Sequence, residues 1–115
     1  ADIVVSVNTV SGFVRDPASA TIMAKVNTSM LEYAPAISAD GLELFFTRLD
    51  PATSEARIYQ TIRPNTTSPF GLPRLAGTID GFVEGPALSP DERSLYYHRL
   101  NTVSGKFELY RVTRQ

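Results

Sequence analysis

Residues 35–48, PAISADGLELFFTR, and residues 86–99, PALSPDERSLYYHR, are two copies of one motif. A shift of 51 residues superimposes them without a gap, and the match continues through Ile58-Tyr59 and Leu109-Tyr110. Between positions 35 and 63, nine of 29 residues are identical to their counterparts in the second copy. An internal repeat of this length indicates that one structural unit is built twice.

Each copy predicts the same succession of strands and turns. In the first copy, a short strand at 35–38 leads into a turn at 39–41, followed by an aromatic strand at 42–47 and an alternating strand at 57–62. A fourth strand is expected at 73–79. In the turns, serine and aspartate side chains can hydrogen-bond to the backbone just ahead of them. The motif therefore predicts a structural role in the turns for four residues: Ser38, Asp40, Ser89 and Asp91.

The motif also resembles a known repeat. Pro-Ala-Ile-Ser-Ala-Asp-Gly and Pro-Ala-Leu-Ser-Pro-Asp-Glu, each followed by an apolar-aromatic strand and later by Ile-Tyr or Leu-Tyr, are similar to the WD-like β-propeller repeat of TolB-type proteins. The resemblance covers residues 32–115. It implies an all-β fold made of propeller blades, which are four-stranded antiparallel sheets, with about two blades' worth of strands in this chain.

The resemblance divides a single domain, 1–115, into three parts. Residues 1–31 are expected to form outer strands of a preceding blade, 32–82 a complete blade, and 83–115 the inner strands of a further blade. Within the first part, the second half of 18–26 is expected to be a strand, because Thr21, Ile22 and Val26 are β-branched.

A closed propeller requires about four blades or more, which exceeds what this chain contains. Three explanations remain open. The chain is a fragment of a larger propeller, or several copies complete a ring as a homo-oligomer, or the chain stands alone as a pair of sheets or a sandwich. In the second case, terminal strands would pair between copies and remove exposed sheet edges.

Composition narrows the function classes. The 11 basic and 12 acidic residues give a net charge of −1 and form no basic stripe of the kind that binds nucleic acid. The absence of cysteine excludes disulfides and thiolate metal sites, and no apolar run reaches the ~20 residues of a membrane span. No metal-ligand spacing is present, and no cofactor is expected. The family resemblance implies a periplasmic or extracellular location.

Candidate site residues follow from the resemblance and from the places where the repeat is broken. No G-x-S-x-G elbow, the motif of a catalytic serine, surrounds Ser38 or Ser89, and no catalytic residue is expected. In propellers the loop entering the first strand lies on a common binding face, which implies ligand-facing positions for Glu32, Tyr33 and Glu84. His98, the single histidine, breaks the repeat, since Thr47 stands at the matching position.

Arg48 and Arg99 recur at matching places, and each is expected to pair with an acid or stack on an aromatic ring.

The resemblance implies a non-catalytic binding module for a protein or peptide partner. The alternative is the propeller portion of a carbohydrate-active lyase or hydrolase, or of a peptidase, with catalytic residues mostly outside this chain. A broad exposed apolar-aromatic patch would favour a protein partner. Acids clustered on one face would favour the enzyme.

Overall fold

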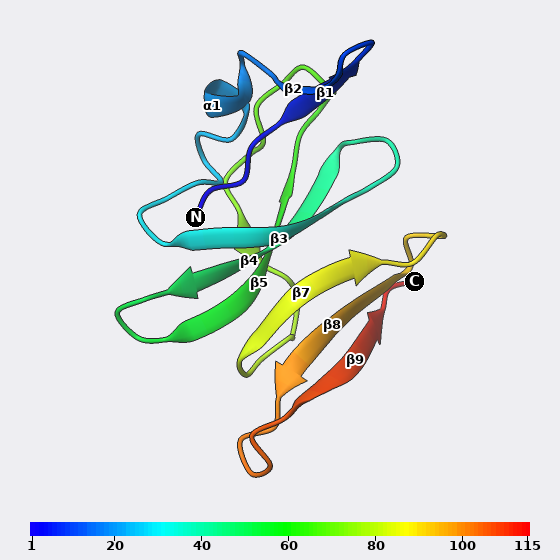
Figure 1. The fold of residues 1–115 in the computed structure, drawn as a ribbon. Coiled ribbons are helices and arrows are strands. Elements are labelled where there is room, and N and C mark those ends of the chain that lie inside the picture. Colours follow the sequence, from blue (N-terminus) through cyan, green and yellow to red (C-terminus); the bar gives the residue numbers. More distant parts are fainter.

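The computed structural model describes all 115 residues and is all-β, with three antiparallel sheets and one short helix, α1 (Ser19–Ile22). The hairpin at the N-terminal end consists of β1 (Ser6–Thr9) and β2 (Gly12–Arg15). The four-stranded sheet contains β3 (Leu31–Ile37), β4 (Glu43–Asp50), β5 (Glu55–Ile62) and β6 (Arg74–Leu75). The three-stranded sheet contains β7 (Val83–Leu88), β8 (Ser94–Leu100) and β9 (Phe107–Thr113). The expected all-β, antiparallel class is confirmed, but the sheets do not close into a ring (Figure 1).

The two larger sheets are built alike at positions 51 residues apart. Phe46 pairs with Tyr59 across β4 and β5, and Tyr97 pairs with Tyr110 across β8 and β9. Both aromatic pairs are stacked, with ring centroids 5.9 Å apart. The first strand of each sheet has a shift in register: after Tyr33 in β3 and after Glu84 in β7. The sheets differ at the outer edge, because β5 pairs with β6 while β9 has no further partner strand.

The turns that carry the repeated motif share one hydrogen-bond pattern. Ser38 Oγ donates to Asp40 Oδ1 at 2.6 Å, and the same oxygen accepts the Leu42 N–H at 3.0 Å. The second turn repeats both contacts at the same distances, with Ser89, Asp91 and Arg93. Hydrogen bonds from the serine hydroxyls, and then from the backbone, lower the pKa of both aspartates below its usual value.

Two hydrophobic clusters lie on opposite faces of the four-stranded sheet. On one face Leu44 and Phe46 pack under the N-terminal segment and the α1 region, in a cluster completed by Ile3, Ile22, Met23, Val26 and Phe70. On the other face Phe45 and Ile58 pack against the three-stranded sheet, in a cluster completed by Ala76, Val83, Leu95 and Tyr97. The four-stranded sheet is therefore covered on both faces. One of these faces is covered by a face of the three-stranded sheet (Figure 1).

The strand expected for the second half of 18–26 is wrong. The chain forms α1 and then consecutive turns as far as Val26. Ile22, Met23 and Val26 are at most 5% exposed, because helical and turn geometry directs all three side chains onto the same face of the sheet. Burial of this one-sided apolar set outweighs the β propensity of the branched residues.

Candidate functional site

Glu32 lies inside β3 rather than in a loop ahead of the first strand. Its carboxylate is fully buried and accepts hydrogen bonds from Arg48 Nε at 2.8 Å, and from the Thr28 backbone N–H at 2.7 Å and hydroxyl at 2.8 Å. Arg48 also donates to the Val26 carbonyl, and its guanidinium lies 4.6 Å from the centroid of the Tyr59 ring. Glu32 therefore holds the N-terminal segment to the sheet and presents no free oxygen to a ligand.

Tyr33, Glu84 and His98 are brought together from three strands and both large sheets. The Tyr33 hydroxyl donates to Glu84 Oε2 at 2.6 Å, and His98 Nε2 lies 3.4 Å from Glu84 Oε1. Burial, followed by the hydrogen bond to Glu84 and its negative charge, raises the pKa of Tyr33 well above its usual range. Because an ionised carboxylate can only accept, the Tyr33 phenol is the donor in this contact.

Glycine at position 85 makes room for this cluster of Tyr33, Glu84 and His98. Gly85 adopts φ +70°, and a Cβ there would lie 2.6 Å from His98 Cε1. The Gly85 N–H donates to Thr47 Oγ1 at 3.0 Å, which adds a second link between the two sheets. The cluster is half-open to solvent, with the His98 side chain 42% exposed and that of Glu84 21% exposed.

The chemistry available to this cluster is limited by its contacts. Glu84 Oε2 accepts the hydrogen bond from Tyr33, which joins the two sheets, while Glu84 Oε1 lies near His98 within one sheet. No three His, Cys, Asp or Glu side chains converge in a way that could hold a metal ion. Every buried side-chain nitrogen and oxygen has a hydrogen-bond partner.

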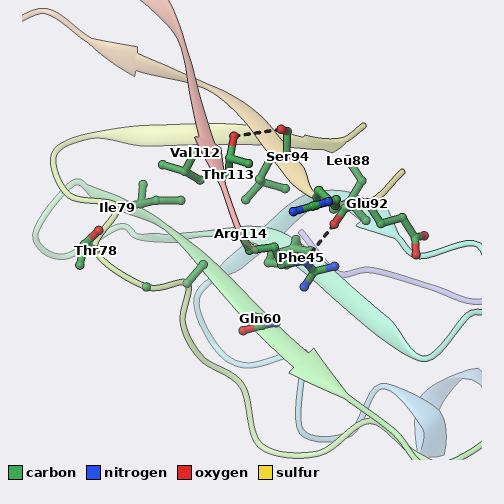
Figure 2. Close-up of a pocket in the computed structure, with 14 residues that line it drawn as sticks. Phe45, Gln60, Thr78, Ile79, Leu88, Glu92, Ser94, Val112, Thr113 and Arg114 are labelled. Carbon is green, nitrogen blue, oxygen red and sulfur yellow. Dashed lines mark hydrogen bonds between the residues drawn. The ribbon is translucent and has the colours of Figure 1, made fainter. Parts of the chain in front are cut away.

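A groove of about 250 Å³ separates the two large sheets at the end near the repeated turns (Figure 2). Phe45, Ala76 and Leu95 contribute apolar surface to it. On its rim Arg114 donates to both carboxylate oxygens of Glu43 at 2.8 Å and to the Glu92 carbonyl at 2.9 Å. The hydrogen bond from Arg114 is the main reason that the pKa of Glu43 lies below its usual value. The charged rim thus joins the sheets as well.

The outer face of the three-stranded sheet has no cover within the chain. We call this surface the open face; its side chains are those of Tyr96, His98, Phe107, Leu109 and Arg111. Two residues 51 positions earlier are buried instead: Ile58 is 1% exposed where Leu109 is 75% exposed, and Ala56 is 0% exposed where Phe107 is 47% exposed. The molecule therefore leaves uncovered a face whose internal counterpart is core.

Of the open face, only His98 was among the site residues expected from sequence. The repeat alignment already places Leu109 at the position of Ile58. The sequence does not show, however, that another sheet covers this face in the four-stranded sheet and not in the three-stranded sheet. In β9 apolar side chains fall at both odd and even positions, which is a pattern of strands covered on two faces. The sequence of β9 therefore indicated that its outer face is built to be covered.

Arg99 makes weaker contacts than its counterpart Arg48. Its guanidinium lies 3.4 Å from the exposed carboxylate of Asp80 and 5.7 Å from the Tyr110 ring centroid. Both arginines thus pair with an acid and lie near an aromatic ring, as the sequence predicted.

Comparison with protein-family models, with curated proteins and with solved structures found no match to this chain. The one helix is far too short to cross a membrane.

Proposed function

We propose that this chain is a non-catalytic β-propeller-type binding module that binds a protein or peptide partner through its open face. The observation that carries the proposal is the exposure of Phe107 and Leu109, whose counterparts in the other sheet, Ala56 and Ile58, are buried. Adjoining exposed apolar side chains on a folded protein typically mark an interaction surface. The partner would cover the apolar side chains, as one sheet covers the other within the chain.

The edge of the same sheet adds a second binding element. All seven residues of β9 are exposed, and no strand pairs with its outer side. An unpaired edge offers backbone N–H and C=O groups to an incoming extended segment, and side-chain pockets beside it supply specificity. The open face and this edge together suit a partner that contributes a strand.

The blade-like build of both sheets supports the proposed kinship with the WD-like repeat of TolB-type proteins. The two sheets share the Ser-Asp turn, the strand register and the stacked aromatic pair, and they pack face to face at a period of 51 residues. The enzyme alternative, whose catalytic residues would lie mostly outside this chain, has no comparable support within it: the Glu32 carboxylate is buried against Arg48, and that of Glu84 accepts a hydrogen bond from Tyr33.

Selection of peptides tests the proposed function. A displayed peptide library is selected on the wild-type protein, and the binders are measured again on Leu109→Asp and on the control Leu72→Asp. Leu72 is also exposed, at 81%, but it lies beside β5 and β6 of the other sheet. We expect binders that lose at least about tenfold in affinity for Leu109→Asp and keep it for Leu72→Asp. Binders indifferent to Leu109→Asp, or no binders at all, would contradict the proposal.

A further inference from the structure

We infer that the partner is a second copy of this chain, which pairs its β1–β2 hairpin head-to-tail with the unpaired edge of β9, beside the open face. This inference rests on the proposed function, because it names the protein that the open face binds.

The packing within the chain indicates what kind of surface covers such a face. The open face is equivalent, residue by residue, to the face of the four-stranded sheet that Val83, Leu95 and Tyr97 cover. That existing interface is one β-sheet laid on another. Strands with apolar side chains are therefore the kind of element that a partner of this sheet would contribute.

The same molecule carries an unpartnered pair of strands at its other end. Every residue of β1 and β2 is exposed, and the hairpin pairs with no other strand. Its exposed apolar side chains include Val7 at 42%, Phe13 at 79% and Val14 at 49%. The hairpin and β9 lie at opposite ends of the molecule, so they cannot satisfy each other within one chain (Figure 1).

The sequences of β2 and β9 are complementary in one antiparallel register. Placing Arg15 of one copy opposite Glu108 of the other also places Val14 opposite Leu109. Phe13 then lies opposite Tyr110. Opposite charges and paired apolar or aromatic residues at facing positions both stabilise antiparallel strands. In this arrangement the hairpin extends the three-stranded sheet, and Val14 stands beside Leu109 on the side of the open face.

The contact joins two different surfaces, so it is head-to-tail. Such contacts either close into a ring or continue as a filament, according to the rotation between copies. Each new copy adds its own unpaired β9 edge, which would bind the next hairpin.

Light scattering tests the inference through complementation. The wild type should exceed the chain mass of 12.6 kDa increasingly with concentration. Leu109→Asp and Phe13→Asp should each remain monomeric, because each lacks one of the two surfaces. An equal mixture of the two should form a dimer with one chain of each, since one variant keeps its hairpin and the other its open face. Leu72→Asp should assemble as the wild type does.

Disulfide trapping provides a readout independent of these charged variants. The chain has no cysteine, so Val14→Cys combined with Leu109→Cys introduces the only thiols. Under oxidising conditions the double variant should give covalent dimers and longer species, while either single variant should form little covalent dimer. Dimers from Leu109→Cys alone would instead indicate a symmetric contact between two β9 strands and would overturn the inference.

The outcomes separate this inference from the proposed function. A wild type that stays monomeric at all concentrations, or a mixture that fails to form dimers, overturns the second copy as partner. If peptides that depend on Leu109 are nevertheless selected, the open face still binds protein and the proposed function stands. If neither assembly nor such peptides are found, the inference and the proposed function are both contradicted.

Discussion

Single residues show how context separates a binding group from a structural one. Glu32 and Glu84 were expected to share a ligand-facing role, yet Glu32 is sealed against Arg48 while Glu84 lies half-open between Tyr33 and His98. The difference follows from what covers each sheet. The N-terminal segment closes over Glu32, and nothing comparable covers Glu84.

Replacing Glu32 by glutamine should destabilise the protein strongly. The change leaves the guanidinium of Arg48, which is only 12% exposed, without its countercharge. Breaking one half of a buried ion pair costs about 3 kcal/mol or more. Urea unfolding should show this loss, while the control Glu55→Gln, at an exposed pair with Arg57, should lose under about 1 kcal/mol. Equal small losses in both variants would contradict the structural role of Glu32.

The pair formed by Glu43 and Arg114 predicts a loss of stability in acid. Because the pKa of Glu43 is lowered in the folded state, the unfolded chain binds the proton more readily. The stabilisation is therefore complete above the ordinary pKa of 4.5 and is lost as pH falls through the lower folded value. Urea unfolding between pH 7 and pH 3 should give a flatter pH profile for Glu43→Gln than for the wild type. Arg114→Gln should flatten the same region, and parallel profiles would refute the prediction.

The role of Ser38 and Asp40 could be predicted from sequence because a turn is local and the second copy repeats it. The partners of Glu32 could not, because Thr28 and Val26 come from an irregular segment whose position depends on the whole sheet.

Among the elements, β3 shows why strand boundaries were missed. The sequence predicted a strand at 35–38, but β3 begins at Leu31. Ala34 has φ +52° and the register shifts between Tyr33 and Ala36, so the strand continues through an interruption that masks it in sequence. This shift of the boundary is what moved Glu32 from a loop into a strand.

The repeated turn yields a prediction about backbone conformation. Gly41 has φ +75°, in the region that disfavours residues with a Cβ, and a Cβ there would make only ordinary contacts with Arg63 and Thr66. Gly41→Ala should therefore cost about 1–2 kcal/mol through conformation alone. Thermal or urea unfolding measures this cost. The comparison variant is Glu92→Gly, at the matching position of the second turn.

Glu92 occupies the same place in the second turn at φ +59°. Glu92→Gly relieves that conformation but removes the carboxylate that accepts the Ala39 N–H, so the two effects oppose each other. Its change in stability should be clearly smaller than that of Gly41→Ala. A neutral Gly41→Ala variant would show that the turn tolerates a side chain without strain.

At the scale of the whole molecule, the repeat predicted both large sheets but not their surroundings. The shift of 51 residues relates β4 to β8 and β5 to β9, because each pattern of alternating residues is carried within its own strand. Coverage of a face depends instead on which layer lies next to it. The four-stranded sheet lies between two layers and the three-stranded sheet beside one.

This asymmetry can be measured with one substitution made at both repeat positions. Ile58→Ala removes a side chain that is 1% exposed in the cluster between the sheets and should cost about 2–5 kcal/mol. Leu109→Ala, 51 residues later, removes one that is 75% exposed and should cost under about 1 kcal/mol when unfolding is measured in dilute solution. At higher concentration the cost of Leu109→Ala should grow, because stability then includes association that only the wild type makes through the open face. A cost that equals that of Ile58→Ala at every dilution would mean that the chain already covers Leu109 itself.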